Sequence, residues 1–185
     1  MNSPWIQTCT GMKFHFTEVD QYPFDLEDFA QPLSLLCRFV GHISKFYSVG
    51  EHCIHVASLL ESRGYNPQTV WFGLIHDAGE AFIGDISRPL KHLVEDTIRP
   101  IEEKILKGIC VNYKVNYTNV DREAVHTADL DLCSTEALKL LPHDPIEDWH
   151  LIGTPIVSID LPCWTPEETK ERYYSLFGTL LVRAL

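Results

Sequence analysis

The segment 66–91 combines the pattern of a core helix with a cluster of ionisable side chains. Asn66 suits the N-cap of a helix, and Pro67 suits its first position. Apolar residues then recur at helical spacing, at Trp71, Leu74, Ile75, Ala78 and Phe82. His76, Asp77 and Glu80 lie together beside this apolar face, and Asp85 follows within ten positions of His76. Because unpaired charges are costly to bury, the pattern predicts a bound metal ion whose remaining ligands come from elsewhere in the chain.

The composition is typical of one globular domain. The chain has 185 residues, of which 45% are hydrophobic, and it is long enough to bury a sizeable core. We therefore expect a single domain over residues 1–185. The sequence holds no apolar run of the roughly 20 residues that a membrane span requires, and its N-terminus lacks the pattern of a signal peptide. A cytoplasmic protein without a membrane partner is the expectation.

The charge of the chain excludes one class of partner. Acidic residues outnumber basic ones by 26 to 15, the net charge is −11, and no run of Lys or Arg stands out. Since sequence-independent binding to a nucleic-acid polymer needs a basic surface, we do not expect it. A phosphorylated small molecule is still a suitable ligand if a metal ion and a few cations gather at one site. The six cysteines lack a CxxC pair, which favours reduced, buried thiols over disulfides or a zinc–thiolate site.

The remaining pattern predicts a helical bundle with a small appendage. Alternating residues on both sides of Thr10 and Gly11 indicate an N-terminal β-hairpin. Beyond the helix from Pro67, further helices are expected from near Pro32, from Ser48 to Gly64, from Arg88 to about Tyr113 with an interruption around Pro100, from about Asn119 to Leu141, and from Pro166 onward. The stretch 142–162 reads as loop with room for a short element. The predicted class is all-α, with a hairpin before the bundle.

Two more of these helices offer metal ligands. His52 lies on the apolar face of its predicted helix, and Asp129 does so in a later helix. Together with His76 and Asp77 they would form a mixed nitrogen and oxygen site. Such a site suits Zn, Co, Mn, Ni or Mg and leaves positions for water and phosphate oxygens. The sequence therefore predicts a divalent metal ion without fixing its identity.

Neighbouring residues are alternatives for the same ligand positions. His55 follows His52 but points about 60° away from it at 3.6 residues per turn. Asp131 competes with Asp129, although helical geometry turns it toward solvent. His126, one turn before Asp129, is a reserve ligand.

The order of a His, an adjacent His-Asp pair and a distant Asp resembles the HD-domain metal-dependent phosphohydrolases. The resemblance covers most of the chain and is carried by the blocks "LCRFVGHISKFYSVGEH", "IHDAGEAFIGDISRPLK", "IEEKI" and "ADLDLCSTE". These blocks are similar to the branch that contains bacterial 5′-deoxynucleotidases and small phage dATP triphosphohydrolases. The hairpin "WIQTCTGMKFHF" and the short length favour the phage type. The resemblance implies an HD-domain helical bundle, a divalent metal ion and a homo-oligomer.

Position by position, the resemblance also assigns roles. It implies that His52, His76, Asp77 and Asp129 are metal ligands and that Glu80 is the catalytic carboxylate. A carboxylate there would orient, or take a proton from, a water that attacks phosphorus. The alternative for Glu80 is an ion pair with a surface Lys or Arg. Asp85 is the next acidic group and would hold water or a sugar hydroxyl.

Arg38 and Lys91 match the family's basic residues near the phosphates, and their chemistry suits that task. An ion pair of Arg38 with Asp25 or Glu27 is one alternative, and a solvated Lys91 is another. Phe39 and His42 would border the base, with ordinary packing as the alternative.

The expected function is metal-dependent hydrolysis of deoxynucleoside triphosphates, with dATP as the substrate that the resemblance implies. A 5′-deoxynucleotidase acting on deoxynucleoside monophosphates would use the same groups. A regulatory module that binds a nucleotide without turning it over belongs to another class, and the presence of both Glu80 and Asp85 argues against it.

Overall fold

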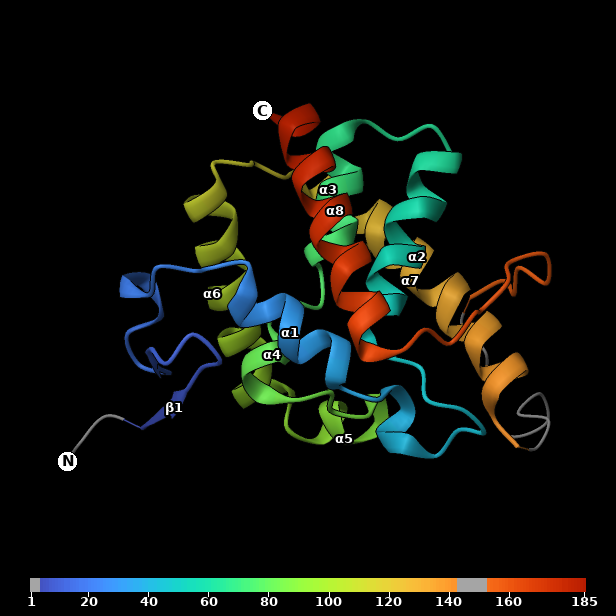
Figure 1. Cartoon of the computed structure of the whole chain (residues 1–185), viewed down its shortest axis with the longest axis horizontal. Coiled ribbons are helices and arrows are strands. Elements are labelled where there is room, and N and C mark those ends of the chain that lie inside the picture. Colours follow the sequence, from blue (N-terminus) through green and yellow to red (C-terminus); the bar gives the residue numbers. More distant parts are fainter. Residues whose placement is uncertain (1–3, 143–152) are drawn as a thin grey trace.

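Helices and one small hairpin make up the part of the chain that the structure describes (Figure 1). This computed structural model describes residues 4–142 and 153–185. The prediction of a mostly helical fold with an N-terminal β-hairpin is confirmed. Within these residues no helix is both long and apolar enough to cross a membrane.

The hairpin pairs β1 (Trp5–Gln7) with β2 (Lys13–His15) in antiparallel register, with Ile6 opposite Phe14. Its turn contains Gly11, whose φ of +84° lies in the region that favours glycine. The backbone N–H of Thr10 donates to Asp28 Oδ1 (3.0 Å), and Phe14 is buried against other aromatic rings. These contacts attach the hairpin to the bundle.

The first long helix, α1 (Glu27–Leu35), begins earlier than predicted. Asp25 Oδ1 accepts the N–H of Glu27 (2.8 Å), so the start lies before Pro32, which falls inside the helix. A single-turn 3₁₀ helix, η1 (Val19–Gln21), precedes α1 in the chain. Leu36 is the C-cap of α1. The residues "RFVG" form a separate turn, η2 (Arg38–Gly41), instead of continuing the helix.

In η2 two consecutive non-glycine residues adopt the left-handed region, Phe39 at φ 54° and Val40 at φ 53°. This backbone is costly for a β-branched residue and is incompatible with an α-helix. The turn belongs to a loop whose ends are joined by a β-bridge between Cys37 and Ser48.

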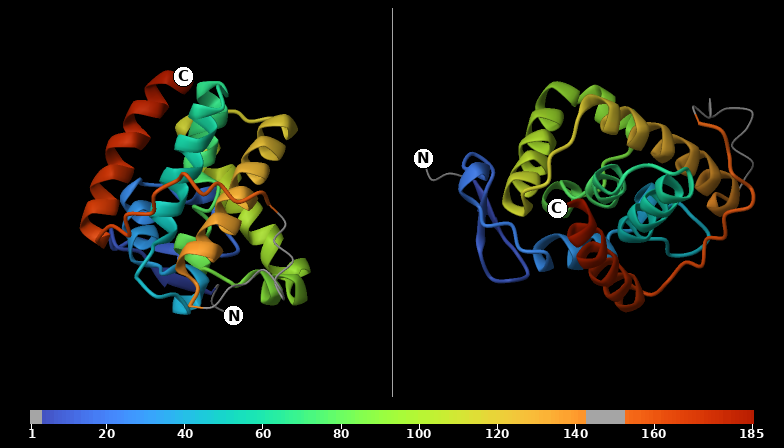
Figure 2. Two further views of the ribbon diagram at one scale, coloured as in Figure 1. Left: turned by 90° about the vertical axis from the view of Figure 1, so that its right-hand side faces the viewer. Right: turned by 90° about the horizontal axis from the view of Figure 1, so that it is seen from above.

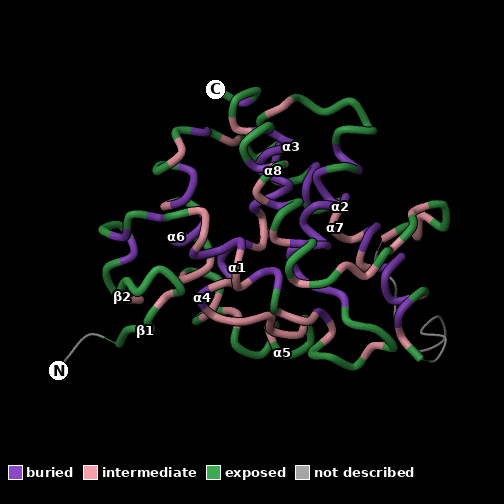
Figure 3. Tube along the Cα trace, in the orientation of Figure 1, coloured by how far each residue is buried: buried purple, intermediate pink, exposed green. Residues whose placement is uncertain are grey.

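The central helices α2 (Val49–Ser62) and α3 (Pro67–Ile75) start as predicted. Ser48 caps α2 by accepting the N–H of Glu51, and Asn66 caps α3 by accepting the N–H of Thr69. Figure 3 shows both helices among the most buried parts of the trace, while the hairpin and α5 are largely exposed or half-buried.

The helix predicted to continue from Pro67 through Phe82 is interrupted. Residues 76–79 form a turn in which the N–H of Ala78 donates to Ile75 O and that of Glu80 to Asp77 O, both at 2.9 Å. Such i→i−3 bonds wind the chain more tightly than an α-helix does. A short helix, α4 (Glu80–Ile83), follows. The interruption therefore lies at His76 and Asp77 themselves.

The next predicted helix is also divided, but at Val94 and not around Pro100. The segment α5 (Arg88–Leu93) ends where the N–H of Val94 donates to Lys91 O, and α6 (Glu95–Tyr113) continues through Pro100. The N–H groups of Thr97 and Ile98 both donate to Val94 O, so a new helix starts there.

Capping boxes start the last two helices, α7 (Asn119–Leu140) and α8 (Pro166–Ala184). Thr118 pairs with Asp121 in the first, and Thr165 pairs with Glu168 in the second. Of the predicted loop after Pro142, residues 153–162 hold neither helix nor strand, and residues 143–152 lie outside the described part.

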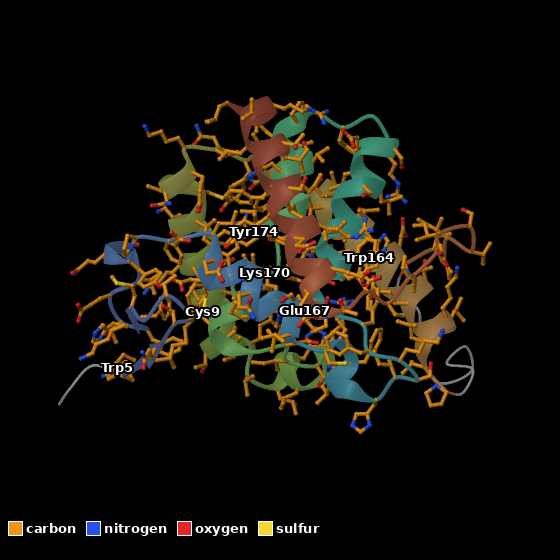
Figure 4. All side chains as sticks on the ribbon, viewed as in Figure 1. Trp5, Cys9, Trp164, Glu167, Lys170 and Tyr174 are labelled. Atoms are coloured by element: carbon orange, nitrogen blue, oxygen red, sulfur yellow. The ribbon has the colours of Figure 1, made fainter. Side chains whose placement is uncertain are left out.

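The helices pack around α2 and α3, which contact α7 on one side and α8 on the other (Figure 2). The hydroxyl of Tyr173 on α8 donates to Leu74 O on α3 (2.7 Å), and both residues are buried. Figure 4 shows Lys170 and Tyr174 on α8, and both side chains bind Glu27 on α1. Packing of α3 between other helices fixes the position of His76 and Asp77 at its end.

We expect Thr165→Ala to lower the free energy of unfolding by about 1 kcal/mol, because the N–H of Glu168 loses its side-chain acceptor. In a chain of this size the midpoint of thermal unfolding would fall by about 2–4 °C. The matched control is Thr179→Ala, the same change at an exposed position of α8 whose hydroxyl bonds only within the helix. Equal effects of the two substitutions would show that the cap contributes nothing.

Candidate metal centre

The four side chains predicted as metal ligands lie together. His52 comes from α2, His76 and Asp77 from the turn after α3, and Asp129 from α7. His52 Nε2 lies 3.1 Å from Asp129 Oδ1 and 3.7 Å from Asp77 Oδ2, and His76 Nε2 lies 3.3 Å from the same Asp77 oxygen. The two imidazole rings are 5.4 Å apart between centroids. Residues far apart in the sequence thus form one compact set of donor atoms.

Both imidazoles are held by their Nδ1 atoms. His52 Nδ1 lies 2.7 Å from Glu136 Oε1, and His76 Nδ1 lies 2.7 Å from the carbonyl oxygen of Gly73. A carbonyl oxygen and an ionised carboxylate only accept, so each Nδ1 carries a proton, and in its neutral form each ring has its lone pair on Nε2. Both Nε2 atoms are buried and make no hydrogen bond of good geometry within the described residues. This is the arrangement in which histidine binds a metal ion.

The electrostatics of the cluster favour a cation. Burial acts to lower the pKa of His76, but the adjacent Asp77 holds that pKa well above its ordinary value. Burial and Arg38 also act to lower the pKa of His52, which Glu136 and Asp129 nevertheless raise. Although burial opposes it, the pKa of Asp77 lies below its ordinary value because His76 is beside it. The raised pKa values of the two histidines report the negative charge around them, which stabilises positive charge, and the lowered pKa of Asp77 reports the positive charge of its histidine neighbour.

A second group of possible ligands shares two of these residues. The sulfur of Cys53 on α2 lies close to His76 and Asp77, a proximity that the sequence pattern did not predict. Burial raises the pKa of the Cys53 thiol to about 11. Because the thiolate is the metal-binding form, the two carboxylates and two imidazoles are the better donor set.

Glu80, the predicted catalytic carboxylate, is buried beside the cluster. Lys91 Nζ lies 3.6 Å from Glu80 Oε1 but only 2.7 Å from Glu102 Oε1, so Glu102 is the closer partner of Lys91. Glu80 Oε2 is buried and has no hydrogen-bond partner within the described residues. Burial, together with the charges of Asp77 and Asp85, raises the pKa of Glu80 well above its ordinary value.

Asp85 is half-buried and follows Gly84, whose φ is +87°. Burial raises the pKa of Asp85, and the positive charge of Arg38 opposes that shift. The charges of Arg38 and Asp77 both act on the Asp85 carboxyl, so this residue lies close enough to the cluster to interact with it electrostatically.

Arg38 faces the cluster and not the partners considered from the sequence. Its Nε donates to Glu136 Oε2 (2.9 Å), and its Nη1 lies 3.7 Å from Asp77 Oδ2. The alternative interpretation, an ion pair of Arg38 with Asp25 or Glu27, is therefore wrong. Glu27 instead pairs with Lys170 on α8. Glu136 is a site residue that the sequence pattern did not single out, although it ends the block "ADLDLCSTE".

Phe39 and His42, the two residues expected to border a base, differ from each other in burial. Phe39 is half-buried and its ring lies 5.7 Å from the Arg38 guanidinium carbon. His42 ends η2 and is exposed, outside the buried cluster.

The alternatives to the predicted ligands point away from the cluster. His55 stacks near Tyr47 and Trp164, at 6.4 and 5.3 Å between centroids. His126 is exposed. The expectation that Asp131 turns to solvent is wrong, because its carboxylate is buried and accepts Arg63 Nη2 (2.6 Å) and the N–H of Thr154 (2.7 Å).

Comparison with known proteins shows to which family the chain belongs. No protein-family model matches the chain. Over 133 residues the chain is 37% identical to the uncharacterized protein YfdR of Escherichia coli strain K12, covering 71% of this chain and 70% of YfdR. The chain belongs to the YfdR family. A more distant relative, the uncharacterized protein RCAP_rcc00048 of Rhodobacter capsulatus, is 21% identical over 161 residues, covering 84% of this chain and 82% of the relative. Neither name states an activity.

In this member of the YfdR family a cavity of about 370 Å³ opens beside His76, Asp77 and Glu80. The charged side chains that line the rest of it come from α5, α6 and α7, and they are Lys91, Arg99, Glu102, Glu103 and Arg122. The sequence pattern did not predict a role for Arg99 or Arg122, because the helices that carry them meet only in the folded chain. Of the predicted site residues, His76, Asp77, Glu80 and Lys91 line this cavity, whereas His52, Asp129 and Arg38 do not.

We expect a divalent ion to raise the thermal unfolding temperature of metal-stripped protein. An ion that binds only the folded state stabilises it by about 2.7 kcal/mol when present at about 100 times its dissociation constant. Differential scanning calorimetry with Mn, Co, Ni, Zn and Mg salts measures this gain. His76→Ala should lose most of it, because one Nε2 donor is removed, and the exposed His126→Ala should keep it. A gain retained in full by His76→Ala would contradict the donor set.

Proposed function

We propose that this protein is a metal-dependent phosphohydrolase of the HD-domain type that hydrolyses deoxynucleoside triphosphates, dATP in particular. One observation carries the proposal: the buried Nε2 atoms of His52 and His76 make no hydrogen bond within the described residues and lie 3.1 to 3.7 Å from oxygens of Asp77 and Asp129, beside a buried carboxylate whose Oε2 has no hydrogen-bond partner there. These residues follow one another along the chain in the order found in the HD-domain phosphohydrolases. The choice of a deoxynucleotide, and of adenine as its base, rests on that resemblance.

His52, His76, Asp77 and Asp129 would hold the divalent ion. When bound, such an ion neutralises charge on phosphoryl oxygens and lowers the pKa of a coordinated water. The mixed donor set admits Zn, Co, Mn, Ni or Mg, so the proposal does not depend on one metal.

Glu80 is proposed as the general base. As a water oxygen forms its bond to phosphorus, the P–O bond to the leaving group breaks, Glu80 takes the proton that the water loses, and the leaving oxygen gains a proton from Glu80 or from solvent. The raised pKa of Glu80, caused by burial and by Asp77, makes it a stronger proton acceptor than an exposed carboxylate. Its free Oε2 is the atom available for this contact.

Arg38 and Lys91 are proposed to bind the phosphates. Glu136 binds the Nε of Arg38, so contacts with phosphoryl oxygens would come from the terminal nitrogens, of which Nη1 also lies 3.7 Å from Asp77 Oδ2. Lys91 would add a compact charge next to Glu80. Asp85 would hold water or a sugar hydroxyl, and Phe39 with His42 would border the base.

A 5′-deoxynucleotidase acting on monophosphates is a second candidate, and the charge of the site favours it. Around the cluster and its cavity the carboxylates still outnumber the cations: they are Asp77, Glu80, Asp85, Glu102, Glu103 and Asp129, against Arg38, Lys91, Arg99 and Arg122. A monophosphate brings less negative charge into such a site than a triphosphate does.

The first test concerns Glu80. Glu80→Gln should lower turnover by about 10²- to 10⁴-fold, the usual contribution of a positioned general base, while metal content is unchanged. Glu123→Gln, the same change at an exposed position of α7, should leave turnover unchanged. Near-normal turnover of Glu80→Gln would transfer the role to Asp85.

The second test concerns the substrate. With metal present we expect phosphate release from dATP to exceed that from dGTP, dCTP, dTTP and ATP, and prolonged chelation should abolish it until a divalent ion is restored. Chromatography of the products should show deoxyadenosine with tripolyphosphate or phosphate. Hydrolysis of deoxynucleoside monophosphates alone would establish the second candidate, and hydrolysis in chelated, metal-free protein would contradict the metal site.

A further inference from the structure

Glu136 on α7 binds functional groups from two other parts of the chain. Its side chain is fully buried. Oε1 accepts the hydroxyl of Tyr47 (2.8 Å) and the Nδ1–H of His52 (2.7 Å), and Oε2 accepts the Nε–H of Arg38 (2.9 Å). Charge-assisted bonds of this kind are about twice as strong as neutral ones.

We infer that Glu136 is the positioning residue that couples the metal site to the phosphate site, by holding His52 with its Nε2 toward the other ligands and Arg38 with its guanidinium beside Asp77. The inference rests on the proposed function, because it assigns Glu136 a task within that same site. Glu136 itself lies behind His52 and is not placed among the groups that touch substrate.

The bond to His52 selects one form of the imidazole. Glu136 also accepts hydrogen bonds from Arg38 Nε and the hydroxyl of Tyr47, so it acts as an acceptor toward His52 as well. Nδ1 therefore carries the hydrogen, and in the neutral ring the lone pair is on Nε2. A negative partner behind a histidine also increases the basicity of its free nitrogen and so strengthens metal binding.

The bond to Arg38 compensates for an irregular backbone. Arg38 lies in η2, where the two following residues have left-handed φ angles, so no regular helix fixes its direction. The N–H of Arg38 donates to Tyr47 O (2.9 Å), which places both residues at the base of the loop closed by Cys37 and Ser48. Both side chains then reach Glu136, so this carboxylate fastens the loop to α7.

Asp131 offers a matched control on the same helix. It is also buried and also pairs with an arginine, Arg63. Its second acceptor oxygen binds the N–H of Thr154, on the side of α7 away from the metal ligands. Removing its charge therefore changes α7 to a similar degree without touching His52 or Arg38.

The test is the affinity of metal-stripped protein for Mn²⁺, measured by calorimetry, in the wild type, Glu136→Gln and Asp131→Asn. A glutamine has one acceptor oxygen, and its amide group would face one of the three donors. We expect Glu136→Gln to bind Mn²⁺ about 10- to 100-fold more weakly, the usual effect of losing a partner behind a metal-binding histidine. Asp131→Asn should match the wild type in affinity, whatever its thermal stability.

A second readout addresses Arg38. In metal-loaded protein the affinity for inorganic pyrophosphate should fall in Glu136→Gln and also in Arg38→Lys, which removes the Nε donor. Only Glu136→Gln should also lose Mn²⁺ affinity, because Arg38→Lys leaves the bond to His52 intact. Equal Mn²⁺ affinity in wild type and Glu136→Gln would overturn the inference alone, whereas a wild type that binds no metal would overturn the proposed function with it.

Circular dichroism establishes that each variant is folded. If Glu136→Gln unfolds because Arg38 is left unpaired, Glu136→Asp replaces it, since aspartate keeps the charge on a side chain shorter by one methylene. That carboxylate cannot reach all three donors, so weaker Mn²⁺ binding than in the wild type is expected. Wild-type affinity in Glu136→Asp would overturn the inference.

Discussion

Negative charge buried where α2, α3 and α7 meet is the constraint on which the rest of the site depends. Each carboxylate there costs free energy unless a cation, a proton or a hydrogen-bond donor compensates it. The surrounding chain supplies partners on the outer side of the cluster: Glu136 and the carbonyl of Gly73 hold the two imidazoles, and Arg38 lies between Glu136 and Asp77. The inward Nε2 atoms make no hydrogen bond within the described residues and face the carboxylates of Asp77 and Asp129 at 3.1 to 3.7 Å, an arrangement that agrees with the proposed metal ion.

The interruption of the helix at residues 76–79 serves the same constraint. In a regular α-helix consecutive side chains diverge by about 100°. Here the chain tightens into i→i−3 bonds, and His76 Nε2 lies 3.3 Å from the carboxylate of the adjacent Asp77. Both residues therefore serve one cluster, and Glu80 begins a new short helix just behind them.

Several features could be predicted from the sequence, because they depend on local caps and on helical faces. They are the hairpin, the starts of α2, α3 and α8, and the set of side chains that gather in the cluster. The sequence did not allow the break at Val94, the left-handed turn after Arg38 or the burial of Asp131 to be predicted. The turn after Arg38 and the burial of Asp131 involve partners distant in the chain, Glu136 and Arg63. The break at Val94 is made by local backbone bonds, in a segment where Pro100 was the stronger signal. The placement of the predicted ligands agrees with a metal site, and metal binding itself stays a prediction.

Two acidic residues of α7 are bound on opposite sides of the helix, Glu136 by Arg38, Tyr47 and His52, and Asp131 by Arg63 and the backbone of Thr154. Rotation of α7 about its own axis would break both sets of bonds at once and leave carboxylates buried without partners. The rotational register of α7 is therefore locked from two sides. Asp129 lies on the same face of α7 as Glu136, and its Oδ1 lies 3.1 Å from His52 Nε2. Its orientation toward His52 therefore depends on the face that Glu136 fastens, while the contacts of Asp131 stabilise the opposite face without setting the positions of the donor atoms.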